Sequence, residues 1–198
     1  MKYKAIFFDW GGVIANDPGD EFLSQLLSQI GATENQKFEI FRTYMSDFMK
    51  GVISEKEYWQ SLRDNYGLVI KDSISEEFNR WNGLVANQEI LELVKNVHNL
   101  GLKTAVLSNV IKPTFNVIEH TGYYDQFDDV IASCEVAYAK PQPEIYQLAL
   151  EKLGVTAKES IFIDDKQSCL DPAAAMGFAT ILAKNPKQII ADVNALLT

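Results

Sequence analysis

Five short apolar runs, each rich in β-branched or aromatic residues, constrain the fold of this chain more than any other feature. Their near-continuous hydrophobicity is typical of strands that are buried on both faces of a parallel sheet. Segments of helical length follow the runs. This alternation predicts an α/β fold with a doubly wound (Rossmann-like) parallel sheet core and helices on both faces. The runs are Lys4–Phe8, Lys103–Leu107, Asp129–Ala132, Ser160–Ile163 and Phe178–Leu182.

The segment before the second run has the best-defined helical pattern. Asn87 is a candidate N-cap and Gly101 a candidate stop, so the segment between them predicts an amphipathic helix packed on the sheet. Its apolar stripe consists of Ile90, Leu91, Leu93, Val94, Val97 and Leu100.

The stretch between the first and second runs is too long for a single crossover and shows helical patterns throughout. Ser54 and Glu57 form a capping-box pattern that opens one of these helices, and Ser75–Trp81 suggests another. We therefore expect residues 16–86 to form an inserted helical subdomain, and residues 1–15 and 87–198 to form the α/β core. Two further apolar stripes in this stretch are Phe22, Leu23, Leu26, Leu27 and Ile30, and Phe38, Phe41, Met45 and Phe48.

Charge and cysteine content limit the partners and the compartment. The net charge of −9 argues against a nucleic-acid surface, because no block of basic residues exists to track phosphates. No stretch is long and apolar enough to predict a membrane span, and the apolar N-terminal run is broken by Asp9 and two glycines, which argues against a signal peptide. Cys134 and Cys169 give no disulfide framework, so a cytoplasmic location is expected.

Polar residues follow four of the runs, at the strand ends where open α/β sheets bind ligands. Asp9 follows the first run, Ser108-Asn109 the second, and Asp164-Asp165 the fourth, while Lys140 lies shortly after the third. Clustered carboxylates repel one another unless a cation compensates them, and a hard cation with oxygen ligands is the usual compensator. The sequence therefore predicts a site for Mg²⁺ at this edge of the sheet.

The same residues suggest a reaction. Asp9, with Asp164 or Asp165 or both, can hold the ion, and Lys140 and Ser108 can grip a phosphoryl group. Gly11, with Gly12, keeps the loop after Asp9 slim and lets a backbone carbonyl face the ion. A carboxylate beside Mg²⁺ and opposite a phosphate can attack phosphorus, and water can hydrolyse the resulting aspartyl phosphate.

The four motifs, taken in order, resemble those of the haloacid dehalogenase superfamily. They read Asp-x-Gly-Gly-Val, Leu-Ser-Asn, Ala-Lys-Pro-Gln-Pro-Glu-Ile-Tyr and Phe-Ile-Asp-Asp. The likeness covers nearly the whole chain, because the helical segment lies where that family carries its C1-type cap. The stretch from Gly51 to Trp59 also resembles the cap of the branch that contains glucose-1-phosphatase-like enzymes.

This resemblance implies a role for each matching residue. Asp9 is then the nucleophile and first metal ligand, and the carbonyl of Gly11 binds the ion. Ser108 and Asn109 bind phosphate, and Lys140 is the lysine of the third motif. Asp164 and Asp165 together form the metal-binding fourth motif. The implied substrate is a small phosphorylated metabolite, for example a sugar phosphate, and the implied assembly is a monomer or homodimer.

Two positions depart from the family pattern. Gly11 stands where many of these phosphatases have an Asp that serves as general acid and base, a function commonly worth about 10²–10⁴-fold. We therefore expect a preference for esters whose leaving group needs little protonation, such as anomeric sugar phosphates and acyl phosphates. Cys169 stands where the family often has an Asn that supports the metal-site loop, so weaker metal affinity or a different loop organisation is expected.

Two alternative functions remain open from the sequence. A 2-haloacid dehalogenase uses the same Asp to attack carbon without a metal, but the pair Asp164-Asp165 has little use in that reaction. The second alternative is a catalytically quiet binding or regulatory domain. Gly11 and Cys169 support that interpretation, whereas retention of Asp9 and Lys140 counts against it.

Overall fold

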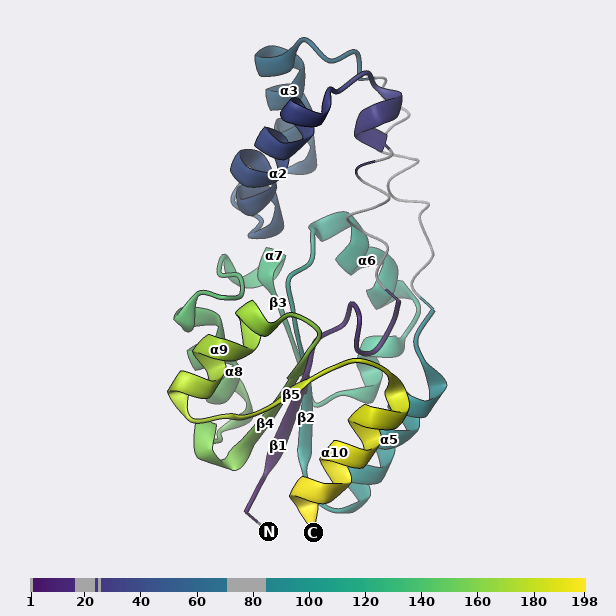
Figure 1. Ribbon diagram of the computed structural model, residues 1–198, viewed down its shortest axis with the longest axis vertical. Helices are drawn as coiled ribbons and strands as arrows, with labels where there is room; N and C mark the ends of the chain where they lie inside the picture. The colour runs from purple at the N-terminus through teal and green to yellow at the C-terminus, as the bar shows by residue number, and fades with distance from the viewer. Residues whose placement is uncertain (1, 17–23, 25, 71–84) are drawn as a thin grey trace.

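Five parallel strands form the central sheet of the computed structural model, which describes residues 2–16, 24, 26–70 and 85–198 (Figure 1). Their order is β3-β2-β1-β4-β5. The predicted doubly wound α/β core is confirmed, and each predicted run agrees with its strand to within one residue at either end. The strands are β1 (Ala5–Phe8), β2 (Lys103–Ser108), β3 (Asp129–Ala132), β4 (Ser160–Asp164) and β5 (Ala179–Leu182).

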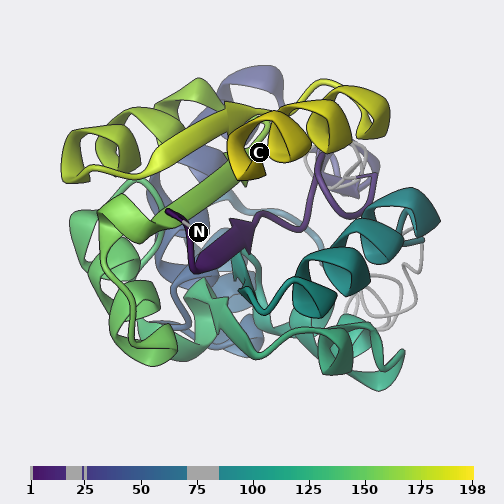
Figure 2. The same ribbon diagram turned by 90° about the horizontal axis from the view of Figure 1, so that it is seen from below.

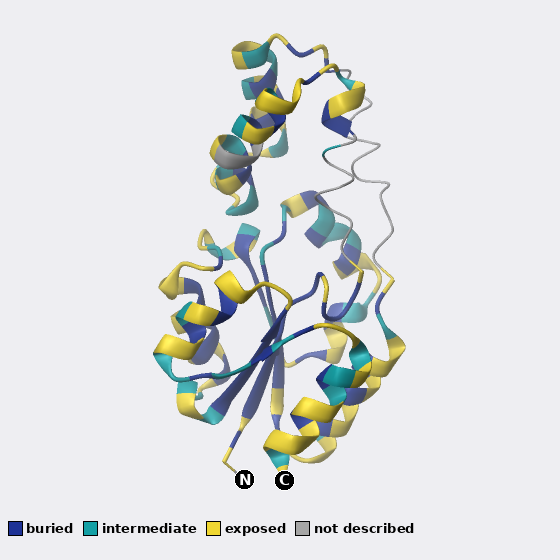
Figure 3. Ribbon diagram, in the orientation of Figure 1, coloured by how far each residue is buried: buried dark blue, intermediate teal, exposed yellow. Residues whose placement is uncertain are grey.

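Helices cover both faces of the sheet, as the view from below shows (Figure 2). One face carries α5 (Gln88–Asn99), α6 (Lys112–His120) and α10 (Pro186–Leu197). The other carries α8 (Pro143–Leu153) and α9 (Gln167–Met176). Successive side chains of a strand point to opposite faces, so each strand contributes to both clusters. The central strands β1 and β4 are buried along their whole length (Figure 3). Short elements at the edges are η1 (Tyr123–Gln126), α7 (Ser133–Val136) and η2 (Ala157–Glu159).

Helix α5 confirms the predicted N-cap but corrects one member of its apolar stripe. The side chain of Asn87 accepts hydrogen bonds from the backbone N–H groups of Glu89 and Ile90. Leu100, expected in the buried stripe, is 52% exposed. It is the C-cap residue of α5, and the chain turns away immediately after it at Gly101, whose φ of +82° lies in the left-handed region.

Two helices inserted after β1 pack against each other with a hydrophobic core of their own. They are α2 (Glu34–Met49) and α3 (Glu55–Tyr66), and they lie beyond the carboxyl ends of the strands (Figure 1). The rings of Phe48 and Tyr58 stack with centroids 4.6 Å apart. The predicted capping box is confirmed, because Ser54 and Glu57 exchange side-chain and backbone hydrogen bonds. Phe38, however, was predicted in the buried stripe of α2 and is 66% exposed.

The chain passes between this helical unit and the core at adjacent points. Ala15 and Ala86 form an antiparallel bridge, and the N–H of Asn87 donates to the carbonyl of Ile14 at 2.7 Å. The helix expected at Ser75–Trp81, together with Phe22 and Leu23 of the first stripe, lies outside the described residues. No helix in the described part of the chain combines the length and apolar character that crossing a bilayer requires.

Candidate functional site

The strand register places two carboxylates side by side. Phe8 pairs with Val106 of β2 and with Ile163 of β4, so Asp9 and Asp164 occupy equivalent positions at the ends of adjacent strands. Asp164 is fully buried and Asp9 is 8% exposed. The sheet is continuous beneath them, because their strands carry mainly apolar β-formers, and this rigid platform fixes where the two side chains leave the backbone.

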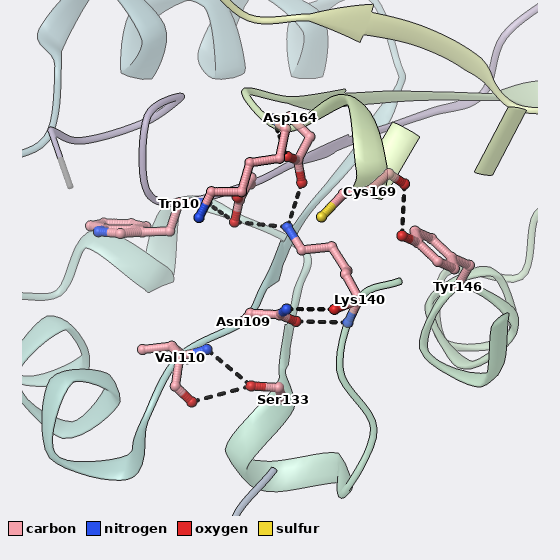
Figure 4. A network of polar contacts seen from close by, with 10 residues as sticks. Trp10, Asn109, Val110, Ser133, Lys140, Tyr146, Asp164 and Cys169 are labelled. Carbon is pink, nitrogen blue, oxygen red and sulfur yellow. Dashed lines mark hydrogen bonds and ion pairs between the residues drawn. The ribbon is translucent and has the colours of Figure 1, made fainter. Parts of the chain in front are cut away.

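Lys140 reaches both carboxylates from the loop between α7 and α8. Its Nζ lies 3.0 Å from Oδ1 of Asp9 and 2.6 Å from Oδ2 of Asp164 (Figure 4). Only 4% of the residue is exposed, and the ammonium also lies 5.3 Å from the centre of the Phe162 ring. The arrangement is an ion triad of two carboxylates and one ammonium, all largely buried.

Electrostatics in this triad follow from burial and unequal charge. Burial alone would lower the pKa of Lys140, but Asp9 and Asp164 outweigh it, so the pKa is raised and the side chain stays charged. Burial raises the pKa of Asp164 to about 6, helped by the charge of Asp9 and opposed by Lys140. One ammonium therefore compensates the two carboxylates incompletely.

A third carboxylate adds to the excess negative charge of this group. One oxygen from each of Asp9, Asp164 and Asp165 lies within 4.8 Å of the others. Asp165 is exposed, and desolvation and the charge of Asp9 raise its pKa. A cluster of three hard oxygen donors with excess negative charge fits a hard divalent cation such as Mg²⁺.

Gly12 allows Asp165 to come this close. Its φ is +73°, in the left-handed region that favours glycine. A Cβ built at this position would lie 2.6 Å from Cγ and 2.7 Å from Oδ2 of Asp165. The neighbouring Gly11 is buried and pairs with Ala15. The slim loop predicted after Asp9 therefore forms, and the space that its missing side chains leave is taken by the carboxylate of Asp165.

The loop after β2 holds Lys140 in place. Oδ1 of Asn109 accepts a hydrogen bond from the backbone N–H of Lys140, and Nδ2 of Asn109 donates to the carbonyl of Lys140, both at 2.7 Å (Figure 4). Ser108, the last residue of β2, is 4% exposed. The side chain of Asn109 thus has a positioning contact that the sequence did not reveal.

Tyr146 contacts the start of α9, the helix that follows Asp165. It lies on α8 with its hydroxyl donating to the carbonyl of Cys169, at 2.7 Å, in the first turn of α9 (Figure 4). Cys169 itself is buried, and burial together with Asp164 raises the pKa of its thiol to about 11, so the thiol stays protonated. A Tyr six residues after Lys140 is the only sequence signal for this contact.

The predicted residues thus gather at one edge of the sheet. Ion pairs and hydrogen bonds link Asp9, Lys140, Asp164 and Asn109, and the carboxylate cluster adds Asp165. Gly11 lies two residues after Asp9 in the chain. Ser108 is the last residue of β2 and precedes Asn109. In a comparison with known proteins, the haloacid dehalogenase-like hydrolase family matches residues 3–177.

The chain is a haloacid dehalogenase-like hydrolase. Among its relatives is the D-ribitol-5-phosphate phosphatase of Bacteroides thetaiotaomicron, which is 25% identical over 193 residues that cover 92% of each protein. The hydrolase is also 27% identical over 221 residues to mouse acyl-CoA dehydrogenase family member 10. That match covers 99% of this chain but only 19% of the mouse protein, so it concerns one part of a much longer chain.

A solved structure has a similar fold. The crystal structure of a haloacid dehalogenase family enzyme from Bacteroides thetaiotaomicron, in complex with magnesium and inorganic phosphate, superimposes with a TM-score of 0.75. It is 25% identical in sequence, and the match covers 92% of this chain and 94% of that one. The family that the motifs resembled is therefore confirmed, and the hydrolase has a relative that binds both the ion and the product expected of phosphate-ester hydrolysis.

Proposed function

We propose that this hydrolase catalyses the Mg²⁺-dependent hydrolysis of a small-molecule phosphate ester through an aspartyl phosphate on Asp9. The observation that carries the proposal is the group of three carboxylates within 4.8 Å of one another, beside one buried lysine, at the carboxyl ends of the strands. The phosphatase named above and the relative's complex with magnesium and phosphate support it.

Asp9, the carbonyl of Gly11 and the pair Asp164-Asp165 would hold the metal. Asp165 is the better candidate for direct contact, because both oxygens of Asp164 already accept hydrogen bonds, from Nζ of Lys140 and from the N–H of Lys166. When bound, Mg²⁺ would offset the negative charge of the carboxylates and of the phosphoryl group. The bound ion would thereby compensate the excess negative charge that Lys140 leaves on Asp9 and Asp164.

The chain's own residues then carry the reaction. A carboxylate oxygen of Asp9 forms a bond to phosphorus, and the ester bond breaks with its electron pair going to the leaving-group oxygen, which takes a proton from solvent. Lys140 stays charged, so it can hold a phosphoryl oxygen while keeping Asp9 oriented. Ser108 and the backbone N–H of Asn109 would bind the remaining oxygens. Water then attacks phosphorus, releasing phosphate and restoring the carboxylate.

The helical unit is the second part of the proposal. Residues 16–86 would act as a cap on a core formed by residues 1–15 and 87–198, since α2 and α3 lie over the strand ends that carry Asp9 (Figure 1). Because Gly11 supplies no proton donor, the substrate would be an anomeric sugar phosphate or an acyl phosphate. The proposed setting is cytoplasmic, with a monomer or homodimer as the working form.

A panel of phosphate esters with Mg²⁺ tests the function. We expect release of inorganic phosphate from glucose 1-phosphate or acetyl phosphate, loss of that release with Asp9→Asn, and loss with a chelator. Turnover that the substitution leaves unchanged would remove the mechanism. Cleavage of a 2-haloacid that survives chelation would instead establish the metal-independent dehalogenase.

A further inference from the structure

Ser133 connects the helical unit to the core on the side opposite the Ala15–Ala86 crossing. Ser133 is fully buried in α7, directly after β3. Its hydroxyl donates to the carbonyl of Met49 at 2.6 Å, and Met49 is the last residue of α2. The carbonyl of Val110 is a second, longer acceptor at 3.2 Å.

The backbone of the turn after α2 comes unusually close to the same short helix. Gly51 has φ +67°, and a Cβ built on it would overlap the carbonyl oxygen of Cys134. Only a residue without a side chain allows this approach. Two independent contacts, one polar and one steric, therefore place the end of α2 on α7 (Figure 1).

Ser133 also reaches the loop that holds the catalytic lysine. Its Oγ accepts a hydrogen bond from the backbone N–H of Val110 at 2.9 Å (Figure 4). Val110 follows Asn109, whose amide forms both hydrogen bonds to the backbone of Lys140. One hydroxyl thus joins α2, α7 and the loop after β2.

We propose that Ser133 is a positioning residue that sets the helical unit relative to Lys140, and that Gly51 permits this docking. The inference rests on the proposed phosphatase function, in which the leaving group points toward the helical unit. Without the hydroxyl, the partly buried Met49 carbonyl and the buried Val110 N–H both lose their partner, which disfavours the docked arrangement. A substrate whose leaving group reaches the helical unit therefore loses contacts, whereas a very small substrate does not.

The test compares two substrates of different size. Ser133→Ala and Gly51→Ala are each expected to lower kcat/KM for glucose 1-phosphate about 10-fold, the order expected when one buried hydrogen-bonding contact is lost, mainly through KM. Acetyl phosphate, which is too small to reach α2, should stay within about threefold of the unsubstituted enzyme. Gly67→Ala is the matched control, because Gly67 has nearly the same φ, +63°, but a Cβ there meets nothing within 4 Å.

Hydrogen exchange of the peptide covering residues 47–53 gives a readout that does not depend on turnover. It should quicken in Ser133→Ala and in Gly51→Ala but not in Gly67→Ala. Equal losses with both substrates, or unchanged exchange in the first two variants, would overturn the positioning role. Failure of the proposed function would give a different result. The unsubstituted enzyme would then hydrolyse neither substrate, while hydrogen exchange would still be faster in Ser133→Ala and Gly51→Ala than in Gly67→Ala.

Discussion

Replacing Gly12 by alanine tests whether Asp165 is a metal ligand. The new Cβ would lie 2.6 Å from Cγ of Asp165, whereas carbon atoms in contact lie about 3.5–4.0 Å apart. The carboxyl group must therefore retreat by about 1 Å. The Cβ of Asp165 would lie only 2.9 Å from the new Cβ, so the backbone of this exposed residue must shift together with its carboxyl group.

The substitution has two effects of different magnitude, one on the stability of the fold and one on Mg²⁺ affinity. An L-residue in the left-handed region costs about 1–2 kcal/mol, which corresponds to a fall in Tm of about 2–8 °C in a chain of this length. Mg²⁺ requires near-ideal octahedral geometry with oxygens at about 2.0–2.1 Å, so a ligand displaced by about 1 Å is lost to the ion. We expect Mg²⁺ affinity to fall by about 10–100-fold, as when groups that hold a metal ligand are altered.

Gly154→Ala is the matched control. Gly154 has φ +63° at the end of α8, and a Cβ there meets nothing within 4 Å. Both variants should lose Tm in a chelator, Gly12→Ala the more because only its Cβ meets Asp165, but only Gly12→Ala should need more Mg²⁺ to reach half-maximal activity and half-maximal thermal stabilisation. Equal Mg²⁺ midpoints in the two variants would refute the placement of Asp165 in the metal site.

Three further predictions follow from named contacts. Lys140→Met leaves Asp9 and Asp164 without their counter-charge, so unfolding free energy should fall by about 3–5 kcal/mol, measured by urea denaturation at pH 7.5, and phosphatase activity should disappear. Glucose 1-phosphate should be hydrolysed at least about 10-fold faster than glucose 6-phosphate, because Gly11 supplies no general acid; a preference for the 6-phosphate would contradict this. The side chains of Lys4 and Thr156 lower the pKa of Glu159 to about 2, so this carboxylate stabilises the fold above pH 4.5 and loses that effect as the pH falls toward 2. At pH 6 the Tm of Glu159→Gln should lie below that of the unsubstituted protein, and this difference should shrink as the pH falls from 4.5 toward 2. A constant difference would exclude the ionic contribution.

The sequence predicted the core well because buried parallel strands have a strong local signal. The run Asp129–Ala132 coincides with β3, and the N-caps Asn87 and Ser54 act as expected. The exposed Leu100 and Phe38 show where such reasoning fails. Apolar spacing along a helix says which residues share a side, but where that side meets the rest of the protein depends on elements far away in the chain.

The same limit applies to the candidate site. Strand-end positions indicated that Asp9, Lys140 and Asp164 would converge, since the carboxyl ends of parallel strands meet at one edge. The contact between Ser133 and Met49 joins residues 84 apart in the chain, and no local pattern marks either one. The close approach of Asp165 to Gly12 is equally invisible in the sequence, because it depends on two loops meeting.

The sequence indicated where Asn109 lies but not that its side chain positions Lys140. The sequence and the family resemblance place it at the phosphate site, yet both polar atoms of its side chain bond to the backbone of Lys140. Lys140 contacts two carboxylates in a buried environment, where the low dielectric strengthens charge interactions, so a small shift of its backbone would change the contacts of all three groups together. The side chain of Asn109 therefore contributes by fixing Lys140, and in the proposed mechanism it is the backbone N–H of Asn109 that would contact phosphate. The adjacent Val110, bonded to Ser133, extends the same support toward α2.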